Sequence, residues 1–147
     1  MAEQKNAKNF IFKDKPNLKM PAYQHPTDPK RTHRLAYIDE ETVPGADFGC
    51  ETMWLLPGEK SKEGQKMVDR HTLPYGKFIG FFSYNYDNIR DLCAEVELWI
   101  GGEKHVMTNN FAAFIPPNVE HGPMIIRNIT KPVFHFTSSP CGEAAKK

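Results

Sequence analysis

The segment from Phe111 to Pro123 constrains the fold more than any other part of the chain. Its apolar run, Phe111–Ile115, is typical of a buried strand. The Pro-Pro-Asn sequence at 116–118 predicts a turn, because proline fixes φ and asparagine tolerates the left-handed region. His121 follows where the chain enters a second apolar stretch. Such a turn holds a histidine at a set depth, as a metal ligand or an acid/base group requires, although an ordinary turn histidine explains these residues equally well.

The remainder of the chain predicts an all-β fold. About eight short apolar segments are separated by turn residues, and none has helical periodicity. The clearest is Ala94–Ile100, in which apolar and polar residues alternate. The charged segment 59–69 is predicted to be a solvent-exposed loop. This pattern favours a double-sheet jelly-roll barrel.

We expect one domain in three parts, because 147 residues are enough for a single hydrophobic core. Residues 1–34 form an extended N-terminal arm, since four prolines at 16, 21, 26 and 29 oppose a helix there. Residues 35–137 form the barrel, and residues 138–147 form a polar tail. An arm of this length is either disordered or packed against a partner subunit.

Charge and cysteine content restrict partners and compartment. The net charge of +1 gives no indication of nucleic acid or membrane as a partner, since both prefer a basic face. No apolar run approaches the length of a membrane span, and the first residues show no secretory signal. The three cysteines are widely spaced and predict no disulfide framework. We therefore expect a cytoplasmic protein.

Two motifs resemble those of the cupin superfamily, over roughly residues 45–137. The residues from Asn110 to His121 are similar to the second cupin motif, G-x5-P-x-G-x2-H, with Asn110 and Asn118 in place of the glycines. Asparagine tolerates positive φ better than most residues do, so both turns can survive this change. The first motif, H-x-H-x3–4-E, is degenerate: His71 is kept, but Leu73 and Lys77 stand where the second histidine and the glutamate are expected. The chain thus looks like a small single-domain bacterial cupin.

A second register of the first motif takes Glu95 as the glutamate, because Glu95 and Gly102 have its E-x6-G spacing. That register retains no motif-one histidine and leaves the strong strand Phe78–Ser83 without a place. The register through His71 is therefore preferred.

The resemblance implies a site inside a jelly-roll cupin barrel. In cupins the motif positions hold a divalent metal, such as Fe, Mn, Zn or Ni, which here gives His71 and His121 as ligands. His135 and Glu97 are candidates to complete the shell, although Glu97 also fits an outward, solvated face. Lys77 either lies at the surface or points into the barrel beside His71 and His121, where its charge would repel a metal ion.

Three functions stay open at this point, and with them the question of whether the chain is an enzyme. The first is a metal-dependent oxygenase, isomerase or lyase in which His71, Lys77 and His121 are the catalytic residues. The second is a metal-free cupin that binds a small molecule or anion with the same three residues. The third is a structural or oligomerising role for the arm. The resemblance also implies a homodimer.

Overall fold

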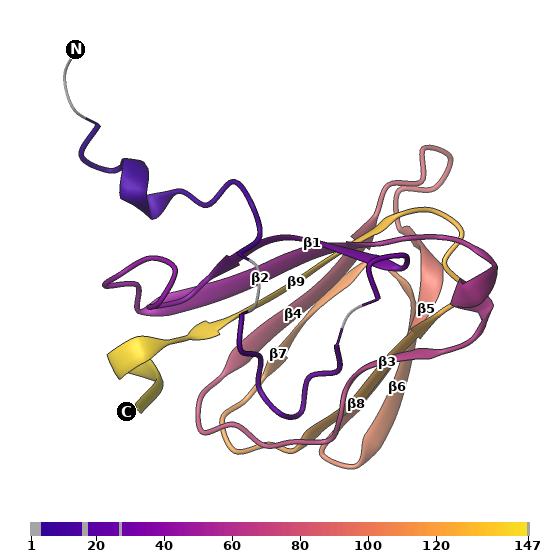
Figure 1. Ribbon diagram of the computed structural model, residues 1–147. Helices are drawn as coiled ribbons and strands as arrows, with labels where there is room; N and C mark the ends of the chain where they lie inside the picture. The colour runs from indigo at the N-terminus through magenta and orange to yellow at the C-terminus, as the bar shows by residue number, and fades with distance from the viewer. Residues whose placement is uncertain (1–3, 16–17, 27, 147) are drawn as a thin grey trace.

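The computed structural model describes residues 4–15, 18–26 and 28–146, and its strands form two facing antiparallel sheets (Figure 1). The five-stranded sheet has the order β1 (Thr32–Ile38), β2 (Phe48–Leu55), β9 (Val133–Pro140), β4 (Lys77–Ser83) and β7 (Phe111–Ile115). The four-stranded sheet has the order β3 (Gln65–Val68), β8 (His121–Arg127), β5 (Asp91–Ile100) and β6 (Glu103–Asn109). The predicted all-β jelly roll with an extended N-terminal arm is confirmed.

The core lies between the two sheets and follows from strand alternation. In β5, Val96 and Leu98 are fully buried, while the residues between them face outward. Met53 and Leu55 of β2 face them from the other sheet, and Phe81 of β4 belongs to the same cluster. The described helical segments are three short 3-10 helices: η1 (Ala7–Asn9), η2 (Glu59–Lys62) and η3 (Gly142–Lys146).

The two asparagines of the second motif have different roles. Asn118 has a φ of 63°, so it occupies the left-handed region as predicted for a residue in place of glycine. Asn110 is not among the residues with positive φ. Its side chain instead accepts a hydrogen bond from the Ser83 amide at 2.9 Å and donates to the Ile89 carbonyl at 2.8 Å. Asn110 therefore ties the start of β7 to the end of β4.

Two segments differ from the sequence prediction. The charged segment 59–69, expected as a loop, contains η2 and β3, because Met67 and Val68 are buried against the core. Strand β3 has only four residues and lies among charged neighbours, so the sequence shows no recognisable alternation there. At the other end, β9 continues to Pro140 and η3 follows, so the expected boundary at residue 137 falls inside a strand, as the boundary at residue 34 falls inside β1.

The last part of the arm lies against the barrel. The His25 amide donates to the Met67 carbonyl at 2.9 Å, and the Asp69 amide donates to the Tyr23 carbonyl at 2.8 Å. Gln24 forms an isolated bridge with Val68, so residues 23–25 extend the edge of the four-stranded sheet next to β3. Residues 4–13 of the arm project away from the barrel (Figure 1). No helix in the described ranges has the length and apolar character needed to span a bilayer.

Candidate functional site

His71 and His121 meet at one end of the barrel. His121 opens β8 directly after the Pro-Pro-Asn turn, and its backbone exchanges two 2.9 Å hydrogen bonds with that of His71. Their ring centroids lie 4.2 Å apart with the planes at 61°. The structure thus brings together two histidines that are 50 residues apart in the sequence, as the motif comparison expected.

The tautomers of both histidines are set by the backbone. His71 Nδ1 lies 2.7 Å from the Asp69 carbonyl, and His121 Nδ1 lies 3.1 Å from the Val119 carbonyl. A carbonyl only accepts, so each Nδ1 carries the proton and each Nε2 presents a lone pair. Both Nε2 atoms are buried and have no hydrogen-bond partner within the described residues. Two neutral imidazole acceptors are therefore held ready for a donor.

His135 is oriented in the same way from the opposite sheet. It lies on β9 with 2% of its surface exposed, and its Nδ1 contacts the Gly80 carbonyl at 2.9 Å. Its ring stacks on Phe81, with the centroids 4.1 Å apart. His135 therefore faces the barrel interior, which the sequence alone did not decide.

Lys77 also points into the barrel, from the start of β4. Its Nζ lies 5.6 Å from the centroid of the Tyr23 ring, and Tyr23 stacks on His71 at 3.6 Å. Burial lowers the pKa of the Lys77 ammonium, and the carboxylate of Glu51 partly opposes this effect. The interior alternative for Lys77 is thus the one that the structure contains.

Burial keeps the three histidines neutral. Desolvation lowers the pKa of His121 to about 4, and the positive charge of Lys77 acts in the same direction. The pKa of His135 is also lowered to about 4, again by burial first and by Lys77 in addition. The pKa of His71 is lowered for the same two reasons, partly offset by its hydrogen bond to Asp69. Lys77 is therefore the cation that all three imidazoles experience.

The carboxylate of this site, Glu51 on β2, was missed by the sequence analysis. It is 7% exposed, and burial raises its pKa. Gln24 of the arm donates to its two oxygens at 3.1 and 3.3 Å, and Arg34 Nη1 lies 3.5 Å away. A signal was present, because Glu51 is in phase with the buried Met53 and Leu55 along the strand.

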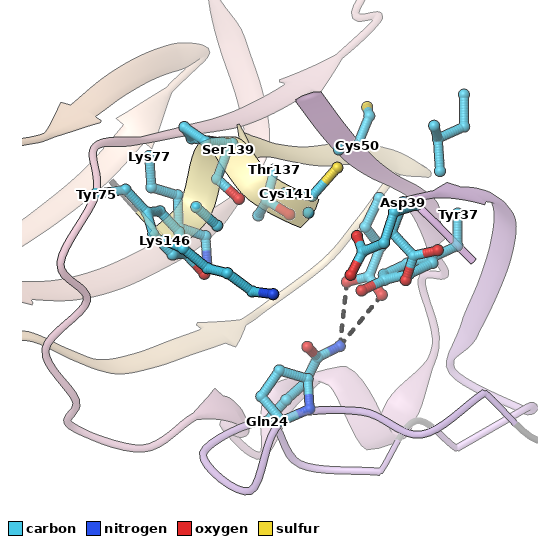
Figure 2. A pocket seen from close by; sticks show the side chains of 18 of the residues that line it. Gln24, Tyr37, Asp39, Cys50, Tyr75, Lys77, Thr137, Ser139, Cys141 and Lys146 are labelled. Carbon is cyan, nitrogen blue, oxygen red and sulfur yellow. Dashed lines mark hydrogen bonds between the residues drawn. The ribbon is translucent and has the colours of Figure 1, made fainter. Parts of the chain in front are cut away.

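Lys77, Glu51 and Gln24 border a cavity of about 330 Å³ between the arm, β2, β9 and the C-terminal segment. Figure 2 shows Lys77, Tyr75, Thr137 and Ser139 on one side and Gln24 across from them, with its hydrogen bonds to Glu51. A second space of about 30 Å³ lies deeper in the barrel and is lined by His135. Four residues border both spaces: Gln24, Glu51, Lys77 and Thr137. His71 stacks against the Tyr23 ring, His121 lies next to His71, and neither histidine borders these two spaces.

Glu97 is not brought to this site. It lies on the outer face of the four-stranded sheet, opposite to the buried Val96 and Leu98. There it accepts hydrogen bonds from Trp99 Nε1 at 2.8 Å and from Arg127 Nη2 at 3.2 Å. The expectation that Glu97 completes a metal shell is therefore corrected, since strand alternation turns it away from the barrel.

Solved structures of known proteins share this architecture. Peruvianin-I, a cysteine peptidase from the latex of Thevetia peruviana, has a TM-score of 0.51 at 13% identity, with 80% of this chain and 66% of that chain covered. A sugar phosphate isomerase of the cupin superfamily from Silicibacter pomeroyi has a TM-score of 0.48 at 13% identity, with 77% and 61% covered. A cupin protein from Bacteroides fragilis has a TM-score of 0.47 at 13% identity, with 85% and 89% covered. At this identity the likeness to peruvianin-I shows a common fold alone, in agreement with the two-sheet jelly roll that the sequence predicted.

The likeness concerns the fold and not the activity, because unrelated functions share such barrels. No family model and no curated protein matches this sequence. Within the barrel, no group of three or more His, Cys, Asp or Glu side chains that could hold a metal ion occurs in the described ranges. What the described residues do place together is Lys77, Glu51 and three neutral histidines.

Proposed function

We propose that this cupin binds a small organic anion in its barrel without a metal, using the ammonium of Lys77 as the central contact. The observation that carries the proposal is the inward position of Lys77, whose Nζ lies 5.6 Å from the Tyr23 ring and whose charge adds to burial in lowering the pKa of all three histidines. Its acidic neighbour Glu51 already interacts with Arg34 and Gln24. The charge of Glu51 is thus shared between Lys77 and Arg34, which leaves the Lys77 ammonium able to bind the carboxylate or phosphate of a ligand.

The neighbouring groups favour an anion that also carries hydroxyl groups. The Nε2 atoms of His71 and His121 are buried acceptors without a partner in the described part of the chain, and leaving them unpaired costs about 1–3 kcal/mol each. A ligand hydroxyl that reaches them satisfies this need, once the Tyr23 ring that covers His71 moves. Thr137 and Ser139 supply further hydroxyls on the cavity wall.

The donor chemistry fits a first-row divalent ion poorly. Such an ion takes about three protein ligands, and here two imidazole nitrogens lie together with an ammonium close enough to affect both. The ammonium adds repulsion where an anionic ligand is needed. The two free Nε2 atoms do favour one further candidate function, proton transfer within the bound molecule, because neutral imidazoles accept protons.

A panel of small carboxylates, hydroxy acids and sugar phosphates, screened by thermal shift with EDTA present, tests the proposal. We expect at least one of these compounds to raise the melting temperature by several degrees, as for a ligand at about 100 times its Kd. Lys77→Met is expected to abolish the shift, whereas Lys131→Met, far from the cavity, leaves it intact. A shift that survives Lys77→Met, or one that needs added metal, contradicts the proposal. Turnover of the stabilising compound, followed by NMR in D2O, separates an enzyme from a binding protein.

A further inference from the structure

We infer that the outer face of the five-stranded sheet is the surface on which two copies of this chain associate. The resemblance to cupins leads to an expected homodimer without assigning it a surface. The inference is independent of the ligand in the barrel. It rests on six aromatic side chains that point away from the core: Trp54, Phe78, Phe82, Phe114, Phe134 and Phe136.

These rings lie on the same face of four neighbouring strands, in one group of four and one pair. Trp54 packs on Phe134 at 5.5 Å, Phe134 lies 6.4 Å from Phe136, and Phe136 stacks on Phe82 at 6.1 Å. Phe78 and Phe114 form a further pair at 5.3 Å. Large parts of this surface meet solvent in the single chain, since Phe114 is 54% and Phe78 is 46% exposed.

Gly80 lies under the centre of this aromatic face. A Cβ at Gly80 would collide with the rings of Phe136 and Phe82, which approach its backbone closely. The absence of a side chain at this position lets the two rings cover the strand closely.

The two outer faces of the barrel differ in charge. On the five-stranded sheet, whose strands are all described, none of the outward positions holds Asp, Glu, Lys or Arg. The four-stranded sheet instead carries the ion pairs of Arg127 with Glu95 and Glu97, and of Lys104 with Glu97. The outer face of the four-stranded sheet is therefore a charged, solvated surface. The outer face of the five-stranded sheet is an extended apolar patch of the kind that marks an interaction site.

A second copy of the chain is the occupant that fits this face. A charged or strongly polar partner would lose hydration without gaining a partner group on the aromatic surface. The same face on another copy is free of charge, and a two-fold axis brings the two together in an isologous contact. Five strands about 4.8 Å apart and about seven residues long at about 3.3 Å each give roughly 550 Å² in projection. Because protruding side chains make the accessible area larger than the projected area, the accessible area approaches the ~800 Å² per partner of a stable interface.

Sedimentation velocity of the full chain at about 1 to 100 µM tests this assignment, since the dissociation constants of dimers with an interface of this size lie at or below this range. We expect the wild type to sediment as a dimer of the 16.8 kDa chain. Phe78→Lys and Phe114→Lys place a charge on the face at exposed positions, where the folded monomer tolerates it, and each is expected to raise the dimer dissociation constant about 100-fold. Val106→Lys is the matched control, because Val106 is 49% exposed on the outer face of the other sheet.

A dimeric wild type and Val106→Lys with monomeric Phe78→Lys and Phe114→Lys support the inference, provided that circular dichroism shows all four to be folded. A monomeric wild type overturns it. So do dimers that persist unchanged in both phenylalanine variants, and so does a Val106→Lys variant that dissociates as they do.

Discussion

The free energy of unfolding is expected to fall by about 4–6 kcal/mol when the pH is lowered from 7 to 4. His121 and His135 are each 2% exposed, and their pKa values are about 4 in the folded chain against an ordinary value of 6.5. Between these pH values the unfolded chain binds more protons than the folded chain. The stability contributed by the two neutral histidines is therefore complete above pH 6.5 and is lost as the pH falls to 4, by roughly 3 kcal/mol for each.

Two other groups modify this slope. His71 acts in the same direction, because its pKa is also lowered. Glu51 acts in the opposite direction, since burial raises its pKa and protonation then favours the folded chain as the pH falls. The net loss is expected to be smaller than the sum over the histidines for this reason.

Urea unfolding at several pH values between 4 and 7.5, with EDTA present, measures the effect. His135→Gln is expected to reduce the pH dependence by about half, because one of the two titrating imidazoles is removed. His105→Gln is the control, since His105 is exposed on β6 and lies near Glu103. A stability that is flat from pH 7 to 4 contradicts the neutral, buried state assigned to His121 and His135.

Glu51→Leu is expected to lower the free energy of unfolding at pH 7 by roughly 3 kcal/mol. The substitution removes the acceptor of the two Gln24 hydrogen bonds and the anion next to Arg34 and Lys77. Arg34 keeps its 2.7 Å contact with Asp14, so the larger part of the loss is assigned to Lys77, which is left in the barrel without a carboxylate. Glu51→Gln keeps the shape and an acceptor and is expected to lose about 1 kcal/mol.

A double-mutant cycle locates this loss. The variant that combines Glu51→Leu with Lys77→Met removes both charges and is expected to be more stable than the sum of the two single losses implies, by a coupling energy of about 1–2 kcal/mol. Denaturant unfolding of the four proteins gives the coupling directly. Additive losses would show that Glu51 and Lys77 do not interact, and the charge arrangement proposed for the cavity would then be wrong.

Sequence alone predicted the barrel because each level of the pattern agreed. Alternation in Ala94–Ile100 and the rigid turn at 116–118 specified strands and a histidine position that the structure retains. The spacing of the degenerate first motif also led to His71 and Lys77. The strands and the turn needed only local periodicity and turn chemistry, whereas His71 and Lys77 were singled out by the resemblance to the cupin motifs.

The rest of the site depends on contacts between distant segments. Tyr23 and Gln24 belong to an arm with no strand periodicity. Only the folded chain shows that Tyr23 covers His71 and that Gln24 donates a hydrogen bond to Glu51. The choice between His135 and Glu97 required knowing which face of each strand is inside. Alternation defines two faces but does not name the inner one, and neighbouring strands decide it.

The proposal that Lys77 takes the place of a metal is tested most directly by titrating the wild type and Lys77→Glu with Zn²⁺ or Mn²⁺ against a competing chromophoric chelator. Lys77→Glu replaces the repelling ammonium, whose charge acts on both His71 and His121, by a carboxylate, and we expect that carboxylate to serve as a third ligand beside the two free imidazole nitrogens. We expect the variant to bind one equivalent of metal at least about 100-fold more tightly than the wild type, and His121→Gln to reverse this gain. One tightly bound equivalent in the wild type, with no gain in Lys77→Glu, would contradict the proposal.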